Sequence, residues 1–201
     1  FVPRLGDDLI DYYPVAAEQE ALVRAYTAAM VEKTIALVGE ALARLTPARL
    51  QTGEGQATFA VNRRNNKEPE VPPSRDKGTL VGPVDYDVPV LAIRDAQKRL
   101  LAVVFGYACH ATVLDFYQWS GDYPGFAQRK VEESHPGVTA LFWAGCGADQ
   151  NPVPRRKVEF AEEYGRQLAE AVDRVLAAVM APVEGELETA YREIDLPFAP
   201  L

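Results

Sequence analysis

The sequence predicts an α/β fold with a mixed, largely parallel sheet flanked by long helices. Short apolar segments typical of strands alternate with amphipathic segments typical of helices along the second half of the chain. Residues 100–143 form a strand–helix–strand pattern, and such crossovers are parallel and right-handed. Hydrophobic residues make up 48% of the 201 residues, which is enough for a core. We therefore expect a single α/β domain over residues 1–201.

In the first half of the chain, residues 16–45 are predicted to form one long helix. Apolar residues recur there at intervals of one or two helical turns, and Pro47 ends the pattern. Residues 57–62 are predicted to form a strand. The polar, proline-rich stretch 63–83 has no periodicity, and loops of that length inside domains usually mark function or disorder.

The second half carries the alternation of strands and helices. One of its strands, residues 100–107, is nearly continuous in apolar residues, as expected when both faces of a strand are covered. A helix beginning near Asp122 follows it, because Pro124 suits a first helical turn. The strands are expected at residues 88–93, 100–107, 138–143 and 186–196, and the helices at residues 124–134 and 157–180.

Charge and composition exclude several function classes. The net charge of −8 weighs against a nucleic-acid partner, because phosphate binding depends on clustered Lys and Arg. The most apolar run, residues 100–114, is shorter than the ~18–20 residues of a membrane helix, so we expect no transmembrane segment there. Because the sequence begins at Phe1 without Met or a signal-like segment, we expect an internal piece of a longer chain.

Polar and reactive side chains gather where the two predicted parallel strands end. In open α/β sheets, ligands bind at the carboxyl ends of the strands. Cys109 and His110 follow the first strand, while Cys146 and Asp149 follow the second. If the strands are neighbours, these side chains and the helix start at Asp122 converge on one edge of the sheet. The sequence therefore predicts a site there.

Each of these residues also has a structural interpretation. His110 is either a satisfied structural residue or a zinc ligand oriented by an Asp. Cys109 and Cys146 are buried small side chains, a disulfide or metal ligands, although neither belongs to a Cys-x-x-Cys pair. Asp122 either caps its helix or has a catalytic role. His135, at a helix end, is expected to be structural.

Two further segments have weaker signals. Asn62-Arg63 begins either a solvated turn or a clamp in which the guanidinium binds a polar or anionic group. Gly145-x-Gly147 lacks the third glycine of a dinucleotide-binding loop, and the chain has neither a Gly-x-Ser-x-Gly elbow nor a P-loop. The sequence therefore gives no indication of nucleotide binding or of a serine nucleophile.

Taken in order, five segments resemble the catalytic domain of the neutral/alkaline (non-lysosomal) ceramidases, and in particular their distant bacterial members. Asn62-Arg63 is similar to the Asn-Arg-Ser segment of the family, and His110 to its Phe-Ala-x-His-x-Thr/Ser strand end. The other segments match an acidic stretch, a Ser-x-Asp-x-x-Gly-x-Ala helix start and an Asn-x-Gly-Asp-x-Ser-Pro-Asn loop. They are Asp85–Leu91, Ser120–Ala127 and Gly145–Pro152.

The resemblance implies a zinc-dependent amidohydrolase. In the family, two His, one Glu and one Tyr hold zinc, and a zinc-bound water attacks the N-acyl amide of ceramide. His110 is the ligand that carries over, and the resemblance places the others outside this chain, within a larger catalytic domain. It also implies that Asn62 and Arg63 contact substrate; Asp122 and Asp149 are catalytic candidates by position.

The resemblance has one departure, and it leaves the function open between classes. The family loop has a Ser implicated in catalysis, whereas residues 147–151 contain no hydroxyl. The expected function is hydrolysis of N-acyl amides; the alternatives are a non-catalytic binding or scaffold domain, and a metallohydrolase for another ester or amide. The resemblance implies a small-molecule or lipid amide substrate and an extracytoplasmic or secreted protein. The oligomeric state is not indicated.

Overall fold

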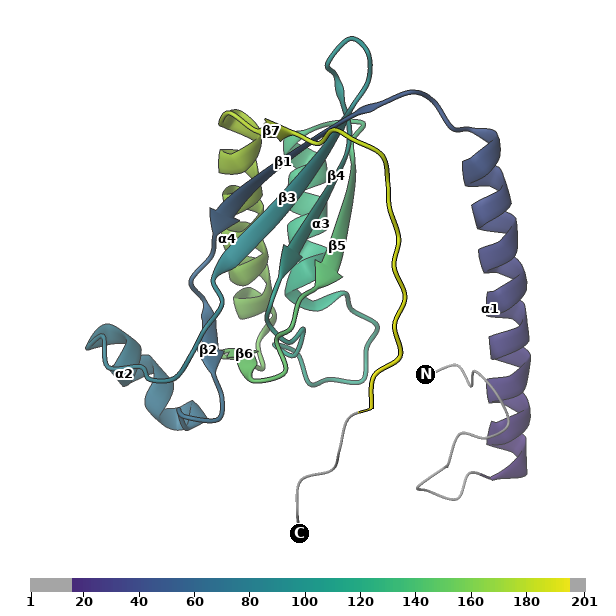
Figure 1. Ribbon diagram of the computed structural model, residues 1–201. Coiled ribbons are helices and arrows are strands. Elements are labelled where there is room, and N and C mark those ends of the chain that lie inside the picture. The colour runs from purple at the N-terminus through teal and green to yellow at the C-terminus, as the bar shows by residue number, and fades with distance from the viewer. Residues whose placement is uncertain (1–15, 196–201) are drawn as a thin grey trace. The chain divides into compact units, whose positions relative to one another are not determined.

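The computed structural model describes residues 16–195 (Figure 1). The chain divides into two compact units, Phe1–Pro47 and Ala48–Leu201. The first contains helix α1 (Ala17–Ala43), which confirms the helix predicted over residues 16–45, and none of its residues is buried. None of the helices in the described part of the chain is apolar over a length that would cross a bilayer.

The second unit is built on a five-stranded sheet with the order β5-β4-β3-β1-β7. The α/β class and the mixed sheet are confirmed, and β4 and β5 are parallel as predicted. The prediction of a largely parallel sheet is wrong, because the other three pairings are antiparallel. The strands are β1 (Arg49–Gln56), β3 (Asp87–Arg94), β4 (Leu100–Tyr107), β5 (Thr139–Ala144) and β7 (Ala181–Pro182).

Strand β1 is the longest element that the sequence pattern did not reveal. Its positions facing the helices are Gly53 and Gly55 rather than large apolar residues, so the usual alternation is missing. A Cβ at these positions would lie 2.7 and 2.8 Å from the methyl groups of Val175. The glycines therefore allow helix α4 (Val158–Ala177) to pack closely on the strand.

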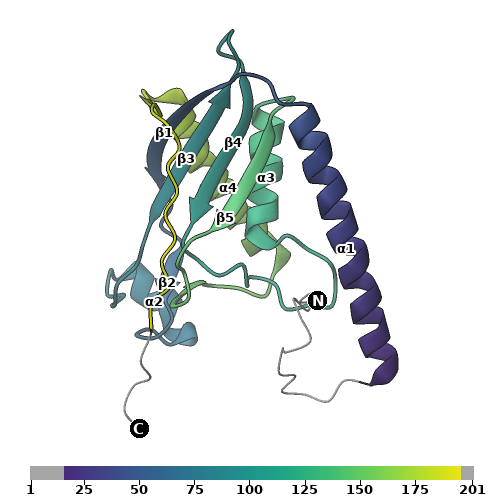
Figure 2. The same cartoon turned by 45° about the vertical axis from the view of Figure 1, so that its right-hand side comes forward.

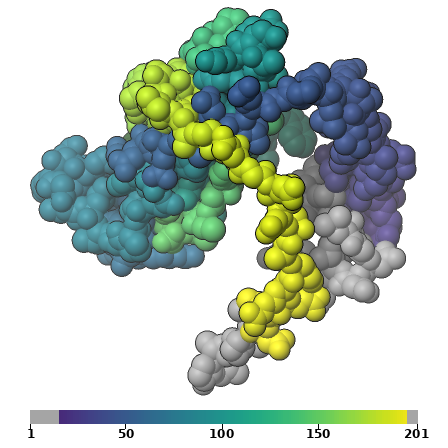
Figure 3. Space-filling view, turned by 45° about the horizontal axis from the view of Figure 1, so that its top comes forward, coloured from purple at the N-terminus to yellow at the C-terminus, as the bar shows by residue number. Residues whose placement is uncertain are grey.

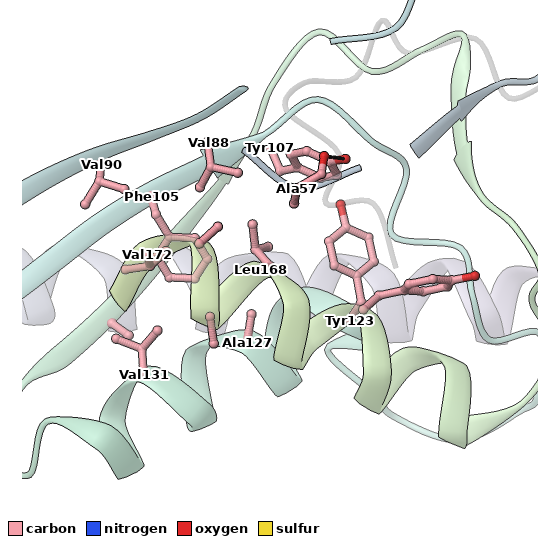
Figure 4. Close-up of a cluster of buried hydrophobic side chains, with 14 of the residues drawn as sticks. Ala57, Val88, Val90, Phe105, Tyr107, Tyr123, Ala127, Val131, Leu168 and Val172 are labelled. Atoms are coloured by element: carbon pink, nitrogen blue, oxygen red, sulfur yellow. Dashed lines mark hydrogen bonds between the residues drawn. The ribbon is translucent and has the colours of Figure 1, made fainter. Parts of the chain in front are cut away.

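Helices α3 (Asp122–Ser134) and α4 lie together on one face of the sheet (Figures 1 and 2). We call this the covered face. Alternate residues of β3 and β4 point into it and are buried, while Ala127 and Val131 of α3 and Leu168 and Val172 of α4 face them (Figure 4). The buried strand residues are Val88, Val90, Ala92, Val103, Phe105 and Tyr107.

The opposite face, which we call the open face, carries apolar side chains that remain exposed or half-buried. Leu141 and Trp143 of β5 are 48% and 45% exposed, and Leu50 of β1 is also exposed. In the cross-strand register they share this face with Leu91 and Val104. The prediction that both faces of residues 100–107 are covered is therefore wrong within the described chain.

The chain leaves β1 and enters a second sheet of two short antiparallel strands, β2 (Ala60–Asn62) and β6 (Gln150–Pro152). The predicted strand over residues 57–62 is thus shorter than expected. At the crossing, the hydroxyl of Tyr107 donates a hydrogen bond to the carbonyl of Ala57 at 2.6 Å and accepts one from the amide of Ala60 at 3.3 Å. The ring of Phe59 packs against three tyrosine rings of the core, those of Tyr107, Tyr123 and Tyr164.

The polar stretch 63–83 is ordered, contrary to the expectation of an irregular loop. It contains the short helices η1 (Glu68–Glu70) and α2 (Val71–Asp76). The guanidinium of Arg75 donates hydrogen bonds to the carbonyl oxygens of Phe59 and Val153, which attaches α2 to both short strands. The strand predicted at residues 186–196 is wrong over 186–195, since these residues form no strand, and residue 196 lies outside the described range.

Candidate functional site

The ends of β4 and β5 lie at the same end of the sheet, as predicted from their parallel arrangement (Figure 2). The backbone amide of Gly145 bonds to the carbonyl of Tyr107 at 3.1 Å, and the amide of His110 bonds to the carbonyl of Gln150 at 3.0 Å. The two segments that follow the strands are therefore held side by side. His110 is therefore a neighbour of the loop between β5 and β6, which contains Asp149.

The imidazole of His110 lies against the β5–β6 loop. Its Nε2 atom is 3.2 Å from the carbonyl oxygen of Ala148. A carbonyl oxygen only accepts hydrogen bonds, so Nε2 must carry the hydrogen in this contact. In the neutral ring, the lone pair then lies on Nδ1, which is the atom available to bind a proton or a metal ion.

Gly147 is required for this close approach. A Cβ at residue 147 would lie 2.5 Å from the carbonyl carbon of Ala108 and 2.5 Å from the amide nitrogen of Cys109. Both contacts are with backbone atoms, which cannot turn away as a side chain can. The absence of a side chain at Gly147 therefore lets the loop lie directly on the segment that carries His110.

Asn62 connects three parts of the site and is only 2% exposed. Its Nδ2 atom donates hydrogen bonds to the Asp149 carboxylate at 3.1 Å and to the carbonyl of Pro83 at 2.9 Å. Its Oδ1 atom accepts hydrogen bonds from the backbone amides of Arg64 and Asn65. The interpretation of this segment as a solvated turn is thus wrong for Asn62, which fixes the side chain of Asp149.

Arg63 follows Asn62 and binds the same loop. Its backbone amide donates to the carbonyl of Asp149 at 2.7 Å, and its Nε atom donates to the carbonyl of Ala148 at 3.1 Å. The Ala148 carbonyl therefore contacts both Arg63 and His110. The guanidinium is exposed, and its Nη atoms make no hydrogen bond within the described residues, so they remain available to a ligand.

Asp122 is buried, and both of its carboxylate oxygens accept a hydrogen bond from the backbone. One carboxylate oxygen accepts a hydrogen bond from the amide of Leu114 at 2.9 Å, and the other accepts one from the amide of Tyr123 at 2.7 Å. Its φ angle of 51° is in the left-handed region, which Asp tolerates better than most residues. The carboxylate thus holds the segment between β4 and α3 in place.

The two cysteines are free, so the disulfide interpretation is wrong. Cys109 is buried, and this burial together with the nearby Asp122 carboxylate raises the pKa of its thiol well above the usual range. A thiol in that state is a poor metal ligand because the thiolate is the form that binds metals. Cys146 is exposed on the β5–β6 loop.

Two polar residues of β6 were missed by sequence reasoning. The side-chain oxygen of Gln150 accepts a hydrogen bond from the amide of Asp85 at 3.0 Å. Asn151 is 7% exposed, and its Oδ1 atom is buried without a hydrogen-bond partner in the described part of the chain. An unpaired buried amide oxygen costs about 1–3 kcal/mol, and no sequence pattern signalled this one.

A cluster of charges, also missed, stands beside the short helix η1. The carboxylate of Glu68 accepts hydrogen bonds from Arg155 and Arg156, which precede α4. These bonds, led by the one from Arg155, lower the pKa of Glu68 to about 2. Arg156 also reaches the carboxylate of Asp115 at 3.4 Å. The cluster thus connects η1, the residues before α4 and the stretch between β4 and α3.

The described residues do not by themselves form a complete metal site. Within residues 16–195, no group of three or more His, Cys, Asp or Glu side chains is placed to hold a metal ion. Zinc sites in proteins usually need three or four protein ligands. Nδ1 of His110 fits one of these positions; one oxygen of the Asp149 carboxylate accepts a hydrogen bond from Asn62, and Cys109 is buried.

The fold is similar to part of two solved ceramidase structures. A ceramidase described as complexed with C2 has a TM-score of 0.59 and 22% identity, covering 72% of this chain and 24% of that one. The neutral ceramidase from Pseudomonas aeruginosa has a TM-score of 0.63 and 22% identity, covering 80% of this chain and 27% of that one. No family model and no curated protein matches the chain. This chain spans about a quarter of the length of the two structures, and at this identity the similarity shows the fold.

Proposed function

We propose that this chain is part of the catalytic domain of a ceramidase-like hydrolase that cleaves N-acyl amide bonds. The observation that carries the proposal is the placement of His110: its imidazole stands at the carboxyl end of β4, held by the Ala148 carbonyl, and Nδ1 has no hydrogen-bond partner among residues 16–195. The similarity of the fold to neutral ceramidases supports the same assignment. Ligand sites in open α/β sheets occupy this edge.

In this proposal the residues around His110 position it and bind substrate. Asn62 orients the Asp149 carboxylate, and the Arg63 backbone and Nε fix the loop against which the imidazole rests. The free Nη atoms of Arg63 donate hydrogen bonds to a polar group of the substrate, a role suited to a guanidinium. Asp149 lies within the site as an acceptor or proton carrier. The carboxylate of Asp122 holds the segment that follows His110.

Zinc is the cofactor that we propose for this site, with His110 as one ligand and the remaining ligands from outside the described residues. When bound, zinc lowers the pKa of a water molecule to about 7 and polarises a carbonyl group, which suits amide hydrolysis at neutral pH. The chain supplies the imidazole of His110, and the Ala148 carbonyl of the β5–β6 loop fixes its tautomer by accepting the hydrogen bond from Nε2. A lipid amide substrate and a secreted location are part of the same proposal.

A second candidate is hydrolysis of an amide or ester other than ceramide. The observation that favours it is the absence of a hydroxyl from residues 147–151, where the ceramidase loop that this segment resembles has a Ser. A panel of N-acyl amides and esters on the full-length protein separates ceramide hydrolysis from hydrolysis of these other substrates.

The test is to replace His110 in the full-length protein and to measure zinc content and N-acyl amide hydrolysis. Replacing a residue that hydrogen-bonds to a metal ligand typically lowers metal affinity or activity roughly 10–100-fold. His110→Ala removes the proposed ligand itself, so it should lower the zinc affinity and the rate of hydrolysis by at least about 100-fold. The matched control is His135→Ala, which removes the chain's other histidine. His135 is paired with Asp173 at 2.9 Å at the end of α3.

Two results would count against the proposal. Normal zinc content and normal rate in His110→Ala would remove His110 from the site. Equal losses in His110→Ala and His135→Ala would show a general effect on folding rather than a role in the site. If the wild-type protein binds zinc through His110 but hydrolyses no amide or ester in the panel, the non-catalytic binding domain becomes the better description.

A further inference from the structure

A cationic groove lies at the end of the sheet opposite to His110. It has a volume of about 680 Å³ and is lined by the start of β1, the β3–β4 hairpin and the segment after β7. Its charged lining residues are Arg49, Arg94, Lys98 and Glu184. Because β4 is eight residues long at about 3.3 Å per residue, roughly 26 Å separate the two ends of the sheet.

The three cations of this groove have no carboxylate partner among residues 16–195. Arg49 and Arg94 are directly opposite each other in the antiparallel β1–β3 pair. Like charges in that position repel and destabilise a sheet. Lys98 has a φ angle of 65°, a conformation that L-residues seldom adopt. In a chain with a net charge of −8, this arrangement concentrates positive charge at one place.

One of the guanidiniums is also held in a fixed orientation. Nε of Arg94 donates a hydrogen bond to the side-chain oxygen of Gln51 at 3.0 Å, and Nη1 donates to the carbonyl of Lys98 at 3.4 Å. Both acceptors are neutral, so they orient the group without neutralising it. A guanidinium held in this way presents its remaining N–H groups to an anion at a low entropic cost.

The rest of the lining consists of the polar Gln51 and four apolar residues, Ala48, Leu50, Pro182 and Val183. Leu50 is 38% exposed and Val183 is 46% exposed. The amide of Val183 bonds to the carbonyl of Leu50 at 2.9 Å, which fixes the segment after β7 against β1. Figure 3 views this end of the sheet, with the yellow segment running past the blue start of β1.

We propose that this groove binds a small phosphate monoester that carries an apolar group. Three cations and one carboxylate give the lining a net charge of +2. A phosphate monoester carries about −1.5 to −2 at pH 7 and accepts bidentate hydrogen bonds from arginine, so it matches the lining better than a carboxylate does. The volume is within the range of small-molecule sites, about 300–1,000 Å³.

Titration of the full chain with phenyl phosphate tests the proposal, with binding measured by calorimetry at constant ionic strength. Saturable binding at one site is expected with a dissociation constant of about 1 mM or lower. Arg49→Gln and Arg94→Gln should each weaken it by roughly tenfold or more. Glu184→Gln should tighten it, because the only acid of the lining is lost.

The matched control is Arg166→Gln, which removes the same charge from an arginine that is already paired with Glu163 and Glu170. It should leave the affinity for phenyl phosphate unchanged. Arg49→Gln should also raise the melting temperature slightly, because a like-charge repulsion is removed, so unfolding cannot explain its loss of binding.

Three outcomes would overturn the proposal. The first is the absence of saturable binding up to 10 mM phenyl phosphate, a limit about tenfold above the expected constant. The second is an equal loss of affinity in Arg166→Gln, which would indicate general attraction to the surface. The third is binding to phosphatidylglycerol vesicles without binding of phenyl phosphate, which would make the partner a membrane surface rather than a small molecule.

Discussion

Both faces of the five-stranded sheet carry apolar strand residues, but these residues are buried on one face and partly exposed on the other. On the covered face, Phe105 and Val103 are completely buried under α3 and α4. On the open face, Leu141 and Trp143 of the adjacent strand remain about half exposed. The difference shows that an apolar strand sequence indicates which residues can be buried, whereas the neighbouring elements decide which of them are.

The largest expected effect compares the truncation of one aromatic residue on each face. Phe105→Ala should lower the free energy of unfolding by about 3–5 kcal/mol, because it removes a buried ring and leaves a cavity. Trp143→Ala, on the open face, should cost about 1 kcal/mol or less. Urea denaturation followed by circular dichroism measures both. Equal losses would mean that the open face contributes to the core as much as the covered face does.

The second comparison uses two glycines: Gly165 of helix α4, which packs on the covered face, and Gly106 of β4, next to Trp143 on the open face. A Cβ at Gly165 of α4 would lie 2.5 Å from the Cβ of Phe126 and 2.9 Å from the amide nitrogen of Ala127, in α3. Gly165→Ala should therefore cost about 1–3 kcal/mol by forcing the helices apart, even though Ala favours a helix. At Gly106 the nearest atoms belong to the half-exposed indole of Trp143, which can turn away.

Gly106→Ala is thus the control for Gly165→Ala, and it should lower the free energy of unfolding by less than about 1 kcal/mol. Thermal unfolding of the two variants under the same conditions gives the comparison. If Gly106→Ala proves the more costly change, the position of Trp143 is fixed more firmly than its exposure implies.

The smallest effect concerns the charge cluster at Glu68. Its pKa is lowered from 4.5 to about 2 in the folded protein, so the ionised carboxylate stabilises the fold above pH 4.5. That contribution is lost as the pH falls from about 4.5 to 2. Glu68→Gln should therefore be less stable than the wild type by about 1 kcal/mol at pH 7, since the cluster is partly exposed.

The stability difference between Glu68→Gln and the wild type should narrow between pH 4.5 and pH 2, which chemical denaturation across this range would measure. Glu133→Gln is the control, because Glu133 is paired with Lys130 on the exposed surface of α3 and should respond less. A stability difference for Glu68→Gln that does not change with pH would show that the ion pairs contribute nothing and that only packing was altered.

Most of the sheet and its helices could be predicted from the sequence, because their patterns are local. Strands β3, β4 and β5 and helices α3 and α4 are all marked by apolar periodicity. The approach of His110 to the β5–β6 loop also followed, since parallel neighbours end at the same edge. The parallel share of the sheet was overestimated because only the β4–β5 crossover could be recognised.

The remainder depends on contacts between distant parts of the chain. Strand β1 is polar and uses Gly53 and Gly55 where other strands use large side chains, so no periodicity marks it. The hydrogen bond between Asn62 and Asp149 joins residues 87 positions apart, and their separation in sequence gives no sign of it. The Glu68 cluster likewise forms only after η1 and the start of α4 come together.

A single phenol oxygen allows the chain to pass from one sheet to the other. Where β1 has ended and β2 has only begun, the hydroxyl of Tyr107 bonds to the peptide groups of Ala57 and Ala60, in the role that a neighbouring strand would otherwise take. A phenylalanine there would keep the shape of the ring but would leave the carbonyl of Ala57 and the amide of Ala60 without these hydrogen bonds. One oxygen atom at the far end of a core side chain therefore helps to hold the crossing that leads to Asn62, together with the bonds from Arg75 and the pairing of β2 with β6.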